Sequence, residues 1–180
     1  GARPDAQVLE AMLSALPRQP EHLATVLCGE WSQPGWWGAG RPVEWSDAVR
    51  LAVSVAHSVG VELTVEQDGE APWHPGRCAR LVARGEAIGH AGELHPDVVL
   101  AYGLPARSCA AEIDLTAILA AAQPVAAAPR VSGFPVAKED VALVVDEQLP
   151  SATLLLALRA GGGELLEAVR LFDVYSGPQV

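Results

Sequence analysis

The sequence predicts an α+β fold in two units: a mixed, mostly antiparallel sheet with helices, followed by a shorter β-α-β unit. Two observations support this. Short apolar or alternating segments, typical of strands, are separated by turn signals such as Asp68-Gly69. An Ala-rich stretch bounded by prolines at residues 124–129 then interrupts the pattern. We therefore expect one domain over residues 1–128 and a second over residues 129–180.

The first unit alternates helical and strand patterns. Apolar residues spaced three and four apart predict helices at residues 5–16, 49–59 and 116–122, the second capped by Ser46 or Asp47. Strand patterns occupy residues 22–28, 61–66, 78–83, 86–94 and 109–115. The segments 78–83 and 86–94 meet near Gly85 and predict an antiparallel hairpin.

The most informative stretch is residues 86–99, which reads as a strand, a sharp corner and a short helix. Gly89 and Gly92 suit close backbone approach or a bulge in the strand. Pro96 suits the first turn of a helix and holds His95 extended, while Asp97 complements the helix dipole.

The second unit reads as strand, helix and strand. A β-branched run lies at residues 140–146, and Pro150-Ser151 opens a helix that three glycines at 161–163 should stop. A long apolar segment follows at residues 165–175. By itself such a unit leaves ladder groups of its strands unpaired, so we expect it to self-associate or to be mobile.

Composition excludes several functional classes. The 180 residues are 50% hydrophobic, enough for a sizeable core, and no apolar run has the length of a membrane span. Twelve basic residues face 22 acidic ones, which is not the footprint of an autonomous nucleic-acid binder, so any RNA contact should be local. Three cysteines without close pairing predict free, buried thiols in a reducing, cytoplasmic setting.

Candidate chemistry is sparse. One group of His and Cys residues lacks the ligand spacing of a zinc site, so we expect no metal; it comprises His74, Cys78, His90, His95 and Cys109. No nucleophile elbow and no phosphate-binding loop occur, so we expect no catalytic residue. Trp31, Trp36 and Trp37 lie in one Gly-rich loop, where they either cover the edge of the core or form a stacking platform.

Several motifs carry a family resemblance. Residues 73–77 (Trp-His-Pro-Gly-Arg) and 88–96 (Ile-Gly-His-Ala-Gly-Glu-Leu-His-Pro), with Phe134-Pro135 and the segments 140–145 and 170–175, resemble the later part of the β subunit of bacterial phenylalanyl-tRNA synthetases. The resemblance implies a class II synthetase-like core in the first unit. It implies the first half of a ferredoxin-fold anticodon-binding domain in the second.

The resemblance also implies a function. The parent enzyme would be a phenylalanine–tRNA ligase, an α₂β₂ assembly that uses ATP and Mg²⁺, with its chemistry in the catalytic α subunit. Here residues 108–115 carry Glu112 and Asp114 but neither the arginine nor the glycine of an ATP-holding strand, so this chain should be catalytically silent and bind neither cofactor. Its partners would be the α subunit and tRNA(Phe), and it would act as a scaffold.

The resemblance assigns residues to two roles. Structural or interface residues are Arg77, Glu93 and His95. Candidate tRNA contacts are Phe134, Lys138, Arg159, Arg170 and Tyr175, in a segment with three basic against seven acidic residues. The alternative is a stand-alone module that self-associates or senses a small molecule, and a weaker one is an independent hydrolase.

Overall fold

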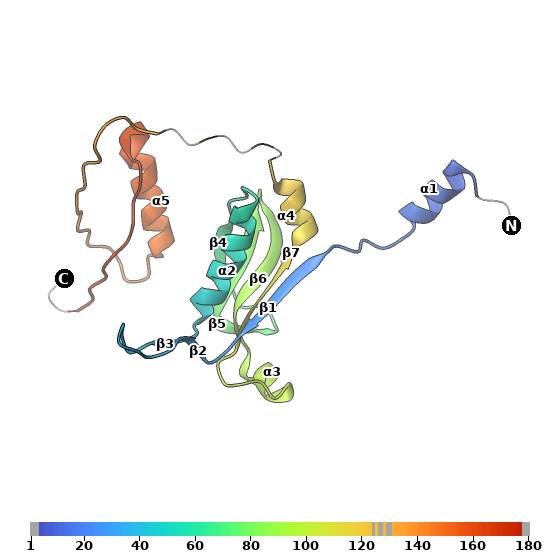
Figure 1. Cartoon of the computed structure of the whole chain (residues 1–180), viewed down its shortest axis with the longest axis horizontal. Helices are drawn as coiled ribbons and strands as arrows, with labels where there is room; N and C mark the ends of the chain where they lie inside the picture. Colours follow the sequence, from blue (N-terminus) through green and yellow to red (C-terminus); the bar gives the residue numbers. More distant parts are fainter. Residues whose placement is uncertain (1–3, 124, 126–127, 129–130, 178–180) are drawn as a thin grey trace. The chain divides into compact units, whose positions relative to one another are not determined.

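The computed structural model describes residues 4–123, 125, 128 and 131–177. The chain divides into two compact units, Gly1–Ala128 and Pro129–Val180 (Figure 1). Most of the stretch 124–129, which the sequence marks as the connection, lies outside the described residues.

A five-stranded sheet forms the centre of the first unit. Its strands are β1 (His22–Leu27), β4 (Thr64–Asp68), β5 (Trp73–Ala83), β6 (Glu86–Leu94) and β7 (Cys109–Asp114). Their order is β1-β7-β6-β5-β4, and every neighbouring pair is antiparallel. The β5–β6 hairpin turns at Arg84 and Gly85, both at positive φ, as a tight two-residue turn requires. The predicted α+β fold with an antiparallel sheet is confirmed.

Helices and a small hairpin surround this sheet. Those near the sheet are α2 (Trp45–Ser58), α3 (Pro96–Ala101), α4 (Leu115–Ala121) and the hairpin strands β2 (Glu30–Ser32) and β3 (Arg41–Pro42). A further helix, α1 (Ala6–Ser14), lies away from the sheet and buries none of its residues (Figure 1). The predicted cap of α2 is wrong: Glu44 precedes the helix, and Asp47 lies in its first turn and accepts the Glu44 N–H at 2.9 Å. None of the helices described in the structure is both long and apolar enough to span a membrane.

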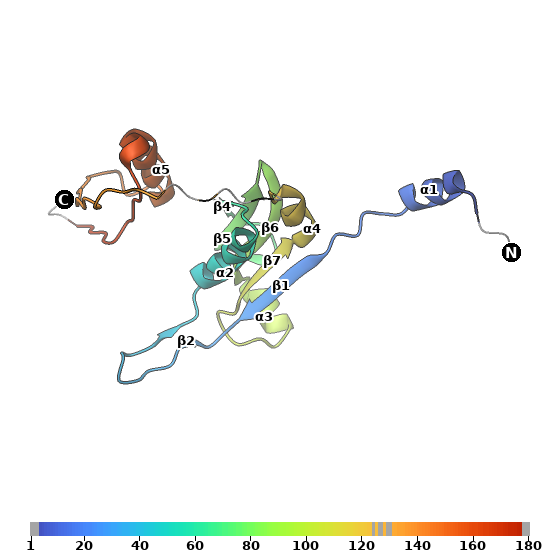
Figure 2. The same cartoon turned by 45° about the horizontal axis from the view of Figure 1, so that its top comes forward.

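The core lies between α2 and one face of the sheet (Figure 2). Ala48, Ala52 and Ala56 line the buried side of α2, and small side chains at this helical spacing let the helix axis approach the strands. Leu81 and Ile113 meet them from the sheet and are fully buried. Alternation along the strands therefore leaves a second sheet face that is free to carry polar residues.

Two glycines of β6 are required by close packing of strands. A Cβ on Gly89 would collide with the carbonyl oxygen of Glu112, and one on Gly92 with that of Arg77. The sequence expectation of close backbone approach at both positions is confirmed.

The second unit contains α5 (Ser151–Gly162) and a 3₁₀ turn at Gly163–Leu165. The helix ends at the three glycines as predicted: Gly161 and Gly162 are its last residues, and Gly163, with a φ of 63°, is its C-cap. No strand forms at 140–146 or 165–175 within the described residues 131–177, contrary to prediction. In a split β-α-β arrangement the two strands are not neighbours, because another strand lies between them. Each segment therefore lacks a ladder partner here.

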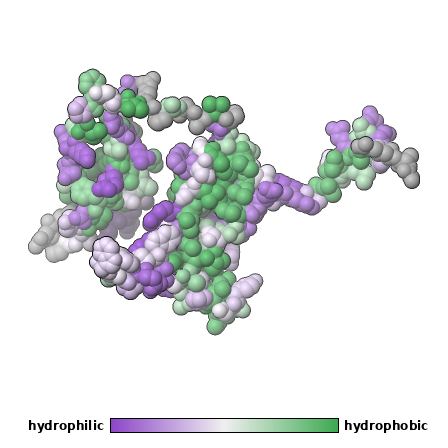
Figure 3. Space-filling view, in the orientation of Figure 1, coloured by the Kyte–Doolittle hydropathy of each residue, from purple (hydrophilic) through white to green (hydrophobic). Residues whose placement is uncertain are grey.

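Exposure of apolar side chains follows from that missing ladder. Hydrophobic surface is visible on the molecule in Figure 3, and in the second unit Val131, Phe134 and Leu165 are each at least 85% exposed. No residue of α5 is buried. The described part of this unit thus presents many of its apolar residues to solvent.

Candidate subunit interface and nucleic-acid-binding residues

One buried carboxylate is held by two arginines at an end of the sheet. Glu93, in β6, is 5% exposed, and its Oε1 accepts from Arg77 Nη1 at 2.8 Å. Arg107 Nη2, from the turn before β7, lies 3.4 Å from Oε2. A buried carboxylate needs such partners to remain ionised. The outer parts of both arginines reach solvent, with side-chain exposures of 41% and 61%, so the cluster also presents positive charge at the surface.

His95 connects β6 to α3. Its Nδ1 accepts the Asp97 N–H at 3.2 Å, which satisfies one free donor in the first turn of the helix, while Pro96 needs no partner there. The backbone N–H of His95 donates to the Pro72 carbonyl oxygen at 2.9 Å. The structure thus brings Arg77 of β5 into contact with Glu93 of β6, and His95 follows Glu93 by two residues at the corner after β6.

A second buried carboxylate was not identified from the sequence as part of a site. Asp47 is fully buried, and Arg41 donates to both of its oxygens, at 2.6 and 2.7 Å. These hydrogen bonds lower the pKa of Asp47 to about 2 against the cost of burial, with smaller help from Arg50. Arg41 also lies 5.3 Å over the Trp31 ring. The sequence could have indicated this role for Asp47, because the residue is the third of helix α2.

The sheet face opposite α2 carries charge in pairs. Glu66, Arg80, His90 and Glu112 lie in one register row across β4, β5, β6 and β7. Arg80 binds Glu66 at 2.7 Å, and His22, on β1, contacts Glu112 at 2.8 Å. The cationic side chains described on this face are therefore already matched by carboxylates.

The thiols do not form a nucleophilic site. Cys78 and Cys109 are buried, and burial raises the pKa of each thiol to about 11, assisted by nearby carboxylates. At neutral pH both are protonated and weakly reactive. Cys28 follows β1 and is exposed, so the prediction of buried thiols is wrong for this residue.

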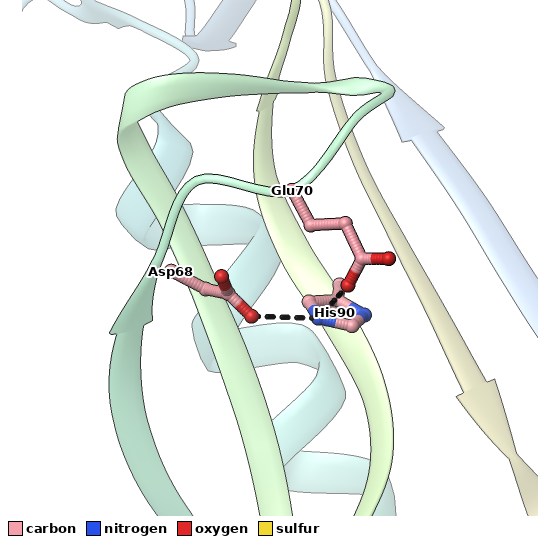
Figure 4. A group of neighbouring side chains, drawn as sticks. All are labelled: Asp68, Glu70 and His90. Atoms are coloured by element: carbon pink, nitrogen blue, oxygen red, sulfur yellow. Dashed lines mark hydrogen bonds and ion pairs between the residues drawn. The ribbon is translucent and has the colours of Figure 1, made fainter.

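The five His and Cys residues singled out in the sequence do not converge. Among the described residues, the side chains that could hold a metal ion are instead Asp68, Glu70 and His90, whose ligand atoms lie within 4.8 Å of one another (Figure 4). Sequence reasoning missed the two carboxylates because Asp68-Gly69 was interpreted only as a turn.

The candidate tRNA-contacting residues all lie exposed in the second unit. Phe134 is 85% and Tyr175 78% exposed, and Lys138, Arg159 and Arg170 are also in solvent. Arg159 lies in the last turn of α5. The unit thus offers two aromatic rings and three cations at its surface.

The tryptophan loop projects from the first unit instead of covering its core. Trp36 is 95% and Trp37 65% exposed, and the two rings meet edge to face at 5.7 Å between centroids. The interpretation of these two as core cover is wrong, because the β2–β3 hairpin holds them at its tip, where Gly35 and Gly38 pair.

Comparison with known proteins identifies the family. The family model described as "Phenylalanyl tRNA synthetase beta chain CLM domain" matches residues 6–115. The chain belongs to this family. A second model, "Ferredoxin-fold anticodon binding domain", matches residues 132–180. The resemblance seen in the sequence is thereby confirmed.

Curated relatives agree with this assignment. The chain is 54% identical to the phenylalanine–tRNA ligase β subunit of Thermobifida fusca, over 98% of the chain and 22% of that protein. It is 52% identical to that of Streptomyces avermitilis, over 99% and 22%, and 50% identical to that of Cutibacterium acnes, over 99% and 21%. The chain thus spans about a fifth of the length of these synthetase β subunits.

Proposed function

We propose that the chain is the part of a phenylalanine–tRNA ligase β subunit that supports the catalytic α subunit and contributes part of the anticodon-binding arm. The parent enzyme would attach phenylalanine to tRNA(Phe) in the cytoplasm, using ATP and Mg²⁺, with the reaction taking place in the α subunit. The chain itself acts as a scaffold.

The observation that carries this proposal is the charge on the sheet face opposite α2. Forming an adenylate requires cations that offset the charge of the triphosphate and stabilise the transition state. On this face Arg80 is bound to Glu66 and His22 to Glu112, so binding a nucleotide there would mean breaking existing contacts with carboxylates. This pairing of charges supports a scaffold role for the sheet and not a nucleotide-binding one.

The cluster of Arg77, Glu93 and Arg107, with His95 beside it, is the part of the core that we assign to the α-subunit interface. It combines a fixed geometry with partly exposed guanidinium groups, which suit contact with carboxylates or main-chain carbonyls of a partner. Arginine is also enriched at the energetically dominant positions of protein interfaces.

The second unit supports local RNA contact. Phe134 and Tyr175 can stack on unpaired bases of an anticodon loop, and Lys138, Arg159 and Arg170 can meet phosphates. With three cations against seven acidic residues in segment 131–180, this contact is weak and depends on the rest of the assembly.

Two measurements on the α–β enzyme test this division of labour. Replacing Phe134 by Ala in the assembled enzyme should raise KM for tRNA(Phe) and leave phenylalanine-dependent ATP–pyrophosphate exchange unchanged, because exchange needs no tRNA. Glu139→Gln, at a neighbouring exposed acidic position, serves as the control and should leave that KM no higher. If Phe134→Ala abolished exchange, or left KM for tRNA unaltered, the proposed role would be contradicted.

Self-association is a second candidate function, favoured by the apolar exposure of the second unit. The segments 140–146 and 165–175 lack ladder partners within the described residues, and open strand edges recruit other chains. Sedimentation equilibrium of the chain alone distinguishes the cases: a mass that rises from monomer to dimer with concentration supports this candidate, and a constant monomer mass removes it.

A further inference from the structure

A histidine and two carboxylates converge above the sheet at the end of β4. Asp68 is the last residue of β4, Glu70 lies in the connection to β5, and His90 is in β6. His90 Nε2 is 3.0 Å from Asp68 Oδ2 and 3.9 Å from Glu70 Oε2. Figure 4 shows both carboxylates directed at the imidazole ring. We propose that these three side chains bind a divalent transition-metal ion such as Zn²⁺.

The spacing of the ligand atoms fits such an ion. A tetrahedral Zn²⁺ with bonds of about 2.0–2.2 Å holds its ligand atoms about 3.3–3.6 Å apart. The two distances from His90 Nε2, 3.0 and 3.9 Å, lie on either side of that range, and all three ligand atoms lie within 4.8 Å of one another, so side-chain rotations would bring them onto one ion. One nitrogen and two carboxylate oxygens suit Zn²⁺ or Mn²⁺ better than Mg²⁺ or Ca²⁺, which favour oxygen alone. Water would complete the coordination.

Neighbouring groups hold the ligands in place. The Gly69 N–H donates to Asp68 Oδ1 at 2.7 Å, which leaves Oδ2 directed at the site. Trp73 stacks on His90 at 6.4 Å between ring centroids and fixes the plane of the imidazole. These contacts come from outside the three ligands, and such outer contacts are what orient ligands in metal sites. Asp68 and His90 are each 24% exposed, so an ion can reach them without crossing the core.

Charge also favours a cation here. Two carboxylates meet a single imidazole, and Arg80, the nearest arginine across the strands, is bound to Glu66 at 2.7 Å. Arg80 attracts Asp68 and Glu70 through space, but its hydrogen bonds go to Glu66. Both carboxylates lie on a protein whose net charge is already −10. A divalent ion would neutralise both.

His90 differs from three other histidines in the number of carboxylates that lie close to it. His22, His57 and His95 each lie within 4.0 Å of one carboxylate, whereas His90 has two. The His22–Glu112 pair, at 2.8 Å on the same sheet face, is closer than the His90–Asp68 pair but has only one carboxylate. It therefore provides a matched control.

The test is metal binding by the purified, tag-free chain after chelator treatment. Isothermal titration with Zn²⁺ alone should give one equivalent bound, and Co²⁺ alone should show visible absorption of a bound ion. His90→Gln and Asp68→Asn should each weaken binding at least about 10-fold, the loss typical when metal-site residues are altered. Glu70→Gln should weaken it too and cannot harm folding, because this side chain is 72% exposed in a connection. His22→Gln should bind like wild type.

The proposal is overturned if wild type binds less than half an equivalent of Zn²⁺ at 100 µM metal, on the order of the weakest useful affinity. It is also overturned if Glu70→Gln and His90→Gln bind like wild type, or if His22→Gln loses binding to the same extent. Circular dichroism of each metal-free variant shows whether the sheet is intact. None of these readouts depends on tRNA charging, so the result is independent of the proposed function.

Discussion

Asp47 offers the sharpest test of how the core is held together. The carboxylate is fully buried, and it accepts two hydrogen bonds from Arg41 and one from the Glu44 N–H. Asp47→Asn keeps the shape of the side chain and the ability to accept the Glu44 bond. It removes the charge and the bidentate contact, so the variant isolates the ionic contribution.

The magnitude follows from the pKa of Asp47. Its fall from 3.8 to about 2 on folding corresponds to about 2 kcal/mol of stability at neutral pH. Because the pKa is lowered in the folded state, this contribution is complete above about pH 5 and is lost as pH falls toward 2. About half of it is gone at pH 3. Asp47→Asn should therefore unfold about 2 kcal/mol more easily than wild type at pH 7, and about 1 kcal/mol more easily at pH 3.

Urea unfolding followed by circular dichroism at the two pH values measures both differences. Asp97→Asn is the control. That side chain is 89% exposed, and its contact with His95, at 3.5 Å, lies at the surface, so the substitution should change stability by less than about 0.5 kcal/mol. A loss at pH 7 no larger than that of the control would refute the reasoning. An equal loss at pH 3 and pH 7 would show that the effect is steric and not ionic.

Three further predictions follow from burial and backbone packing. Gly92→Ala should lower stability by about 3 kcal/mol in the same assay, because its Cβ would collide with the Arg77 carbonyl oxygen; stability within 0.5 kcal/mol of wild type, roughly the error, would contradict this. Gly161→Ala should instead stabilise α5 by about 1 kcal/mol, because Gly161 lies in the helix and a Cβ there would meet open space. A fall in the helical circular dichroism signal would contradict this. At pH 8 a disulfide reagent should label one thiol, exposed Cys28, within minutes and the other two only after unfolding, since their pKa is about 11; two rapid thiols would refute that.

The first unit could be predicted well because its elements are locally encoded. The hairpin between β5 and β6, the two close-packed glycines of β6 and the corner at Pro96 all follow from residue types with strong backbone preferences. The α2 helix was placed by its apolar spacing, but its start was misplaced. Glu44 and Asp47 both have acidic side chains that can serve at a helix start, and sequence alone does not say which is used.

The second unit shows the opposite case. A β-branched run at 140–146 has strand propensity, but a strand exists only where another strand pairs with it. The described residues supply no such neighbour, so the strand propensity of this run does not produce a strand. The glycines at 161–163, by contrast, end the helix as predicted, because Gly163 adopts the positive φ that suits a residue at a helix C-terminus.

The candidate metal ligands could not be predicted from spacing. Asp68 and His90 are 22 residues apart and lie on strands separated by β5, so only the strand register brings them together. The same holds for Glu93 and Arg77, which meet because β5 and β6 pair. Tertiary register, which a single sequence specifies only indirectly, creates both clusters.

The most direct test of the scaffold assignment is the mass of the particle that forms with the catalytic α subunit from the same source. The chain, co-expressed with α, should elute from size exclusion in a complex whose mass, by light scattering, includes both chains. Arg77→Ala should weaken that complex more than Arg84→Ala, a control at the exposed β5–β6 turn. Separate elution of the chain and α, with the chain folded by circular dichroism, would contradict the account.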